Sequence, residues 1–373
     1  MAQPRVAFAL SASPQPPLRL LTTSLLFARL LRLDAFLVWD HLQNIFPRAL
    51  WDQELTWLAA ARRDPHACYD YQTILGALAK SAGRVRLGVG VTEAIRRHPV
   101  VIAQAALTLA HLTRRPPLLG IGAGERENTE PYGLDFTHPV DRLEEALQVI
   151  RLCFSATGPL DFAGRYFHLD RAVFGLAAVP GRTPELWIGG AGPRMLRLAG
   201  QYGDGWYPVG FFSPEEYAAK LAVIHAAARA AGRDPSAITP SFQPYILVAP
   251  SEREARAMAS TRMMRFLGLL MPAERWRLLG LVHPFGEGFR GYVDFLPERP
   301  TRDELEAAMA AVPPELVDVG AICGTPAQVA ARLRDYADAG MRHVAPQIIS
   351  AAVSRRMAVY GLHAFHYLVQ ACS

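Results

Sequence analysis

Short apolar runs alternate with longer helical patterns along most of the chain, and this alternation restricts the possible folds more than any other feature. Such alternation is typical of parallel βαβ units. The predicted strands fall at 6–10, 35–39, 85–91, 118–121, 185–189, 205–208, 241–248 and 343–349. The predicted helices fall at 17–33, 71–82, 99–112 and 139–154, and a further helix begins at Pro193.

Eight strands with intervening helices favour the α/β class and a (β/α)8 TIM barrel, although an open doubly wound sheet of six strands is also compatible. Two stretches do not fit a minimal barrel. Residues 155–184 follow the fourth unit and contain a predicted edge hairpin, and residues 260–320 lie between the seventh and eighth strands, over the barrel mouth. We therefore predict one barrel domain over residues 1–373 with these two insertions.

The composition permits a large core and argues against nucleic acid as a partner. Hydrophobic residues make up 51% of the chain and charged residues 20%, and the net charge is +5. Lys80 and Lys220 are the only lysines, and no run of five basic residues occurs. Proteins that bind nucleic acid usually cluster their basic residues on one face, so we expect no nucleic-acid partner here.

The chain has the features of a soluble, cytoplasmic protein. Its four cysteines lie far apart with neither CxxC nor zinc-ligand spacing, so we expect reduced thiols. Charged residues interrupt the apolar stretch at 18–38, which leaves no uncharged run of about 18 residues for a transmembrane segment. The first residues also lack the apolar core of a signal peptide.

Polar and glycine-rich residues follow four consecutive predicted strands. Asp40 and His41 follow the second strand, residues 90–92 end the third, residues 120–128 follow the fourth, and residues 189–193 follow the fifth. Active sites of α/β barrels lie where the C-terminal ends of the strands meet. We therefore expect these four segments to converge on one crevice.

Several of these features also have simpler interpretations. Asp40 could cap a helix, His41 could be a solvated loop residue, and glycines at strand ends often serve only tight turns. The glycine run at 120–124 matches a dinucleotide-binding fingerprint incompletely. The helix that begins at Pro193 after a glycine-rich loop offers a phosphate site, because its first N–H groups are unpaired. Glu125 would repel an anion and suits proton transfer near a neutral ring.

Neither a metal site nor a covalent nucleophile is predicted. His98 and His283 each precede a proline, which favours a structural role, and no paired His or carboxylate ligand motif occurs. The chain also lacks a GxSxG elbow and a recognisable cysteine nucleophile. These absences disfavour metal-dependent chemistry and nucleophilic hydrolysis.

Five stretches carry a family resemblance: VWDHLQ at 38–43, RLGVGVTEAIRRHPVVIAQAALTL at 86–109, LGIGAGERENTEPYG at 119–133, ELWIGGAGPRMLRLAGQYGDGWYP at 185–208 and GTPAQVAARLRDYADAGMRHV at 324–344. In these stretches, which follow one another over most of the chain, the sequence resembles the bacterial luciferase-like superfamily. The resemblance is to its branch that depends on the deazaflavin coenzyme F420. Within that branch, HPFGEGFRGYVDFLP at 283–297 is similar to the mycobacterial phthiodiolone and phenolphthiodiolone dimycocerosate ketoreductases.

The resemblance implies a barrel with the deazaflavin across its C-terminal mouth. Asp40 and His41 would match the pair beside the ring, where His41 exchanges a proton with the substrate and Asp40 orients it or contacts the ring edge. Residues 90–91 would form a bulge behind the ring, often with a non-proline cis peptide. Thr92 would hydrogen-bond the ring or its side chain, and Glu125 would handle the proton on the ring nitrogen.

The remaining cofactor contacts implied by the resemblance are a polar contact and a phosphate loop. Asn128 would make the polar contact, and Gly90 and Val91 would form the bulge described above. The phosphate loop would contain Gly190, Ala191, Gly192 and Met195. The predicted function is thus an F420-dependent oxidoreductase that moves a hydride between the deazaflavin and a carbonyl or alcohol carbon, and the resemblance also implies a homodimer.

The scarcity of lysine counts against a glucose-6-phosphate substrate, and the Met- and Leu-rich segment at 260–280 favours a hydrophobic, lipid-like ketone. Three alternatives stay open at this point. They are an FMN-dependent monooxygenase of the same superfamily, a non-catalytic flavin-binding protein, and a sugar-phosphate barrel without a flavin.

Overall fold

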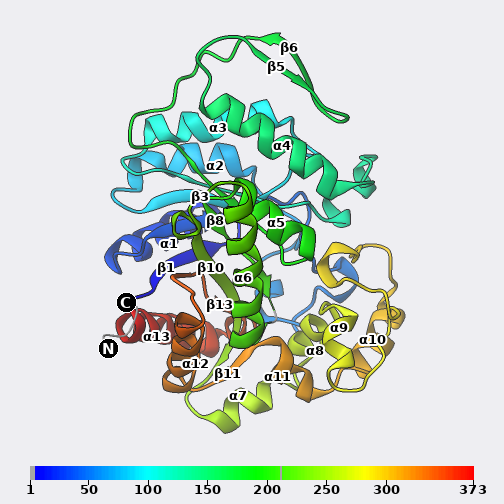
Figure 1. Ribbon diagram of the computed structural model, residues 1–373. Coiled ribbons are helices and arrows are strands. Elements are labelled where there is room, and N and C mark those ends of the chain that lie inside the picture. Colours follow the sequence, from blue (N-terminus) through cyan, green and yellow to red (C-terminus); the bar gives the residue numbers. More distant parts are fainter. Residues whose placement is uncertain (1–4, 211) are drawn as a thin grey trace.

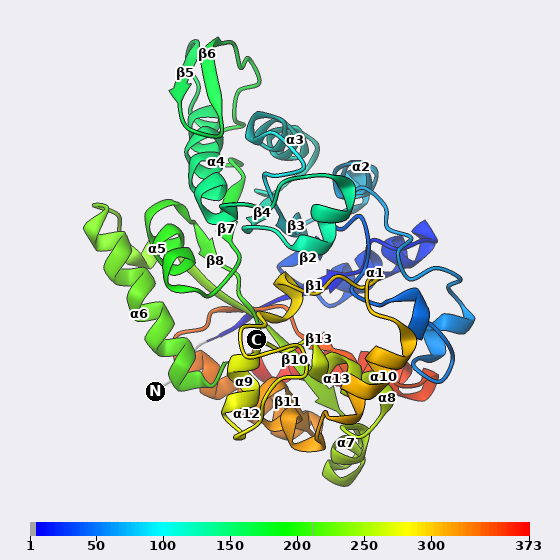
Figure 2. The same cartoon turned by 90° about the vertical axis from the view of Figure 1, so that its right-hand side faces the viewer.

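Eight parallel strands close into a barrel in the computed structural model of the chain, which describes residues 5–210 and 212–373 (Figures 1 and 2). The ring closes because β10 pairs with both β8 and β12, and β12 pairs with β1. In order around the ring the strands are β1 (Ala7–Ala12), β2 (Ala35–Val38), β3 (Arg86–Thr92), β4 (Leu118–Ile121), β7 (Glu185–Ile188), β8 (Gly205–Trp206), β10 (Thr239–Val248) and β12 (His343–Val344). The predicted (β/α)8 TIM barrel is confirmed.

Helices surround this ring (Figure 2). They are α1 (Leu18–Leu30), α2 (Tyr71–Leu78), α3 (Pro99–Leu112), α4 (Pro139–Phe154), α5 (Pro193–Tyr202), α6 (Pro214–Ala230), α12 (Pro326–Asp338) and α13 (Arg355–Cys372). Proline is the first residue of α3, α4, α5, α6 and α12. It is tolerated there because the N–H group of a first-turn residue has no acceptor within the helix. Ser213 and Thr325 start α6 and α12 with reciprocal capping boxes.

The predicted and observed elements agree in the first half of the barrel and differ in the second. Helices α3 and α4 have the predicted bounds, whereas α6, α12 and α13 had been given none. The predicted strand at 343–349 is divided into β12 and β13 (Gln347–Ile348), since Pro346 has no N–H to donate to a ladder. The predicted strand at 205–208 ends at Trp206, and β9 (Val209–Gly210) follows it.

The barrel interior is filled by side chains. Trp187 and Tyr207 are almost fully buried in one cluster with the small residues Ala9, Ala35 and Ala345. Large and small side chains therefore complement each other across the ring, as in other closed eight-stranded barrels. A filled interior leaves the ends of the strands as the place for a functional site.

The first insertion is the predicted hairpin, formed by the antiparallel strands β5 (Leu160–Ala163) and β6 (His168–Ala172). It projects beyond α3 and α4 (Figures 1 and 2). The Glu145 carboxylate on α4 holds its turn by accepting hydrogen bonds from three consecutive backbone N–H groups, those of Arg165, Tyr166 and Phe167, at 2.8, 2.8 and 3.1 Å. These hydrogen bonds thus attach the hairpin to α4, one of the helices that surround the barrel.

The second insertion contains α8 (Arg262–Leu269), α9 (Ala273–Arg277), α10 (Arg302–Ala310) and α11 (Val317–Gly320). It follows α7 (Glu252–Met258) and precedes β11 (Ile322–Gly324), which pairs with the end of β10. Its Met- and Leu-rich segment packs around Phe266, Leu270 and Trp276 in a second hydrophobic cluster, which also includes Leu50, Leu247 and Met357 from other parts of the chain. Glu298 connects the insertion to the segment after β2, because it pairs with His66 at 2.8 Å and accepts the Arg48 N–H.

All four cysteines have free thiols, as expected. Among the described residues, none of the helices combines the length and the apolar character that crossing a bilayer requires.

Candidate active site

The third barrel strand, β3, ends in a bulge. Its register with β4 shifts between Val89 and Thr92, and the Gly90–Val91 peptide bond within the bulge is cis. The family resemblance implied both features at this position. The bulge directs the Val91 side chain toward the ends of β4 and β7.

Glycines on β4 and β7 make room for the Val91 side chain. An added Cβ atom would lie 3.0 Å from Val91 Cγ1 at Gly120 and 3.1 Å from it at Gly189. At Gly122 the added atom would lie 3.3 Å from Val91 Cγ2. These separations are shorter than the optimal distance between carbon atoms. The glycines at these strand ends therefore serve the packing of the bulge, and not only the turns that follow.

Asp40 is buried at the end of β2 and connects this strand to the segment after β3. Its carboxylate accepts a hydrogen bond from Thr92 Oγ1 at 2.6 Å and pairs with Arg96 and Arg97 at 3.0 and 2.7 Å. Arg96 also pairs with the buried Glu93. Because no helix begins at Asp40, the interpretation of this residue as a helix cap is wrong. The two arginines are contacts that the sequence analysis missed.

His41 lies between two carboxyl groups from the loop after β4. Its Nε2 atom is 3.5 Å from Glu125 Oε2, and its Nδ1 atom is 3.4 Å from Glu127 Oε1. The His41 and Glu125 side chains are 21% and 31% exposed, whereas the Glu127 side chain is 0% exposed. One end of this three-residue group is thus open to solvent, and the other is fully enclosed.

Glu127 is a site residue that the sequence analysis did not single out. Burial raises the pKa of its carboxyl group, and the negative charge of Glu125 raises it further. Its Oε1 atom accepts a hydrogen bond from Asn128 Nδ2 at 3.1 Å, and its Oε2 atom is buried with no hydrogen-bond partner in the described part of the chain. The sequence does show a second acidic residue two positions after Glu125, which could have drawn attention to Glu127. Sequence alone, however, does not tell whether an acidic side chain is buried or exposed.

Asn128 joins the loop after β4 to the loop after β2. It is buried, and its Oδ1 atom accepts the backbone N–H groups of Leu42 and Gln43 at 2.7 and 3.3 Å. Gln43 returns a hydrogen bond from Nε2 to the backbone oxygen of Glu127. These contacts hold the loop that carries His41 against the loop that carries Glu127. A contact between Asn128 and a cofactor stays a prediction.

The loop after β7 leads into α5 with an open helix N-terminus. Gly190 has a φ of 108°, which favours glycine, and its carbonyl accepts a hydrogen bond from Trp206 Nε1 at 2.9 Å. Met195 packs against Gly190. Gly192 begins α5 without a side-chain cap, so the N–H groups of the first turn have no capping partner.

Lys220 on α6 lies beside this loop. Its Nζ atom donates to the Ala191 carbonyl at 3.4 Å and lies 5.2 Å from the centre of the Phe212 ring. From the sequence, the scarcity of lysine counted against nucleic acid and against a glucose-6-phosphate substrate, and neither lysine was expected at the site. The structure brings one of them to the glycine-rich loop at which we predicted a phosphate.

His41, Glu125 and Glu127 also offer three ligand atoms within 4.8 Å of one another, a spacing that a metal ion could use. No metal site had been predicted, because these residues form no recognisable ligand motif in the sequence.

Comparison with known proteins gives the following matches. Residues 54–343 match the family model described as luciferase-like monooxygenase. A phthiodiolone/phenolphthiodiolone dimycocerosates ketoreductase of Mycobacterium tuberculosis is 38% identical over 339 residues, which cover 90% of this chain and 89% of that protein. An F420-dependent hydroxymycolic acid dehydrogenase of Mycobacterium tuberculosis is 34% identical over 197 residues, which cover 52% of this chain and 53% of that protein.

Among solved structures, an F420-dependent secondary alcohol dehydrogenase in complex with an F420-acetone adduct matches with a TM-score of 0.75. The match covers 99% of both chains at 21% sequence identity. At this level of identity the likeness establishes the fold.

Proposed function

Because the chain belongs to the luciferase-like monooxygenase family of oxidoreductases, we propose that it transfers a hydride between coenzyme F420 and a carbonyl or alcohol carbon. The observation that carries this proposal is the position of His41, which follows β2 and lies between Glu125 and Glu127 from the loop after β4. Proton donors and acceptors at such a site suit the interconversion of a ketone and an alcohol, which moves one proton together with each hydride.

The bulge region fits a flat ring. Gly122 and Gly189 carry no side chains beside Val91, and His41 and Glu125 present partly exposed polar atoms. A bound deazaflavin would supply the hydride chemistry, whereas the chain would supply orientation and proton transfer. We assign Gly90, Val91 and Thr92 to the support of the ring.

The loop after β7 fits the cofactor's phosphate. The uncapped N-terminus of α5 favours an anion through its free N–H groups and its helix dipole. An added Cβ atom at Gly192 would meet no atom within 4 Å, and Lys220 places a positive charge beside the Ala191 carbonyl. We therefore assign Gly190, Ala191 and Gly192 to phosphate binding, with Met195 supporting the loop.

We assign the proton of the substrate oxygen to His41 and the proton of the ring nitrogen to Glu125. Asp40 holds the backbone next to His41 through its pairs with Arg96 and Arg97. Each positioned proton transfer contributes about 10²–10⁴-fold to the rate. Replacing His41 with alanine should therefore reduce turnover by about this factor and leave cofactor binding largely intact.

Our proposed substrate is a hydrophobic, lipid-like ketone or the corresponding alcohol. Two relatives carry lipid substrates in their names, a dimycocerosates ketoreductase and a hydroxymycolic acid dehydrogenase. The Met-rich segment is packed inside the second insertion and so is not an open channel. Leu278 and Val282 in the same insertion are exposed, and they provide apolar surface for such a substrate.

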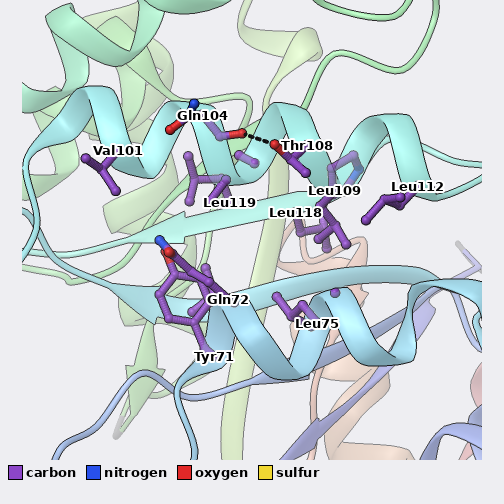
Figure 3. A pocket seen from close by; sticks show the side chains of 15 residues that line it. Tyr71, Gln72, Leu75, Val101, Gln104, Thr108, Leu109, Leu112, Leu118 and Leu119 are labelled. Carbon is purple, nitrogen blue, oxygen red and sulfur yellow. Dashed lines mark hydrogen bonds between the residues drawn. The ribbon is translucent and has the colours of Figure 1, made fainter. Parts of the chain in front are cut away.

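A homodimer in the cytoplasm is our proposed form of the enzyme. An apolar groove of about 250 Å³ lies between α2 and α3, lined by residues that include Leu75, Leu109 and Leu112 (Figure 3). Val101 and Leu112 are exposed at this groove and would be covered by a second copy. The free thiols suit a reducing compartment.

The decisive experiment is a titration of the purified protein with coenzyme F420 and, separately, with FMN. We expect tight binding of F420, followed by reduction of the bound cofactor when a hydrophobic secondary alcohol is added. Binding of F420 without turnover on any ketone or alcohol would instead support a non-catalytic flavin-binding protein.

An FMN-dependent monooxygenase is the second candidate, because the family is described as luciferase-like monooxygenase. A monooxygenase of this kind should bind FMN tightly and consume oxygen when supplied with reduced FMN. Preference for FMN over F420 in the titration would overturn our first proposal.

A further inference from the structure

We propose that Glu127 is a positioning residue that acts through His41: as a neutral acid it donates a hydrogen bond to Nδ1 of His41 and thereby keeps the proton of the imidazole on Nε2. The inference deepens the proposed function and rests on it for its kinetic consequence. Its structural part concerns only residues of this chain and can be tested without a cofactor.

The geometry around the imidazole carries the argument. Each ring nitrogen of His41 faces one carboxyl group, Nε2 that of Glu125 at 3.5 Å and Nδ1 that of Glu127 at 3.4 Å. A neutral imidazole has one N–H donor and one acceptor nitrogen. The Nδ1 atom is buried and has no hydrogen-bond partner within the described part of the chain, although Glu127 lies 3.4 Å away. A small closing movement would satisfy both nitrogens if one carboxyl group is an anion that accepts and the other is an acid that donates.

Burial decides which carboxyl group is the acid. Glu127 is completely enclosed and Glu125 is 31% exposed, so an anion costs far more at Glu127. The negative charge of Glu125 also disfavours the ionisation of Glu127. The raised pKa of the Glu127 carboxyl group agrees with this assignment.

Among the described residues, the cation that acts on Glu127 is one that other carboxylates share. The ionisable groups that interact with it come from several elements and are His41, Cys68, Arg96, Glu125, Tyr132 and Tyr292. Burial raises the pKa of Cys68 to about 12 and also raises the pKa of both tyrosines, so these three are neutral near pH 7. Arg96 is positively charged, but it already pairs with Glu93 and Asp40.

This arrangement lets His41 deliver a proton without first becoming a cation. In ketone reduction a bound reduced cofactor would supply a hydride to the carbonyl carbon, and the carbonyl oxygen would take the Nε2 proton of His41. The Glu127 proton moves to Nδ1, so the imidazole stays neutral in its other tautomer and Glu127 becomes a carboxylate. A proton taken up by Glu125 from the ring nitrogen then returns to Nε2, and the Nδ1 proton returns to Glu127.

The first test is nuclear magnetic resonance of the cofactor-free protein labelled with ¹⁵N-histidine, with the His41 signals assigned by their loss in His41→Gln. We expect wild-type His41 to be the neutral Nε2–H tautomer near pH 7. In Glu127→Leu, which cannot donate to Nδ1, the tautomer balance should shift toward Nδ1–H. An imidazolium, or an Nδ1–H tautomer, in the wild-type protein would overturn the proposal even if the variant failed to fold.

The second test is the pH profile of kcat/KM for ketone reduction in Glu127→Gln. The relay needs the protonated form of Glu127, so wild-type activity should fall as the pH rises through the raised pKa of this group. The amide still donates to Nδ1 but has no proton to transfer. We therefore expect kcat to be lower by about 10²-fold, the lower end for a positioned proton transfer. KM should change little, and the basic limb that Glu127 causes should be lost.

Glu130→Gln is the matched control, because Glu130 lies in the same loop but pairs at the surface with Arg126. It should keep the wild-type profile. An unchanged profile in Glu127→Gln would refute the positioning role. If the wild-type protein neither binds F420 nor reduces ketones, the proposed function fails, and the tautomer measurement still decides the role of Glu127.

Discussion

Replacing Gly120 with alanine should damage the bulge and lower the stability of the barrel. The added Cβ atom would lie 2.4 Å from the backbone oxygen of Val89 and 3.0 Å from Val91 Cγ1. The first contact is with backbone at the centre of a strand ladder, which cannot move aside as a side chain does. Overpacking of this kind costs about 3 kcal/mol at the upper end of its usual range.

Alanine also restricts the unfolded chain more than glycine does, which returns about 0.7 kcal/mol. The expected net loss is therefore about 2 kcal/mol in the free energy of unfolding. Urea denaturation followed by circular dichroism measures it, provided that the slope of the transition stays unchanged. The affinity for F420 should fall as well, because the displaced Val91 side chain belongs to the proposed ring support.

Gly76→Ala is the control for this prediction. An added Cβ atom at Gly76 in α2 would meet no atom within 4 Å. The substitution should therefore stabilise the protein by about 0.5–1 kcal/mol, since alanine is the better helix residue. Wild-type stability and wild-type F420 affinity in Gly120→Ala would refute the view that the close approach of the Val89 backbone oxygen and the Val91 side chain requires glycine there.

Three further predictions concern other parts of the chain. Burial lowers the pKa of His343 to about 4, below the 6.5 of the unfolded chain. Between these two pH values the unfolded state binds more protons than the folded state. The free energy of unfolding should therefore fall by roughly 3 kcal/mol as the pH drops from 6.5 to 4. Urea unfolding should show a weaker pH dependence in His343→Gln. Lys220→Gln should weaken F420 binding by about tenfold, but not the binding of a deazaflavin that lacks phosphate, in fluorescence titrations. The double variant Val101→Glu, Leu112→Glu should be monomeric by light scattering, and a monomeric wild-type protein would contradict the proposed dimer.

Much of the active-site framework was predictable because it follows from strand order. Asp40 and His41 come directly after a predicted strand and Glu125 lies in the loop after another, and parallel barrel strands bring their C-terminal ends together. The bulge at 90–91 was predictable only through the family resemblance. Periodicity describes regular strands, and it contains no information on where a ladder shifts its register.

The partners of these residues could not be predicted. No pattern in the sequence singled out Arg96 and Arg97, but the fold buries the Arg96 side chain and half-buries that of Arg97 against Asp40, where they balance its charge. Lys220 reaches the loop at Ala191 because α5 and α6 pack side by side. Each of these pairings joins residues that are distant in the sequence, so no local pattern records it.

The sequence by itself indicated the barrel and the polar segments that follow its strands, since apolar periodicity, proline positions and glycine runs act locally along the chain. The tertiary structure alone decided the environments of these segments. It made Glu127 an enclosed acid and Glu125 a partly exposed one, although the two residues lie in the same short loop. The physical reason is that desolvation and charge pairing depend on what the rest of the fold packs around a side chain, and these two effects determine the chemistry of an ionisable group.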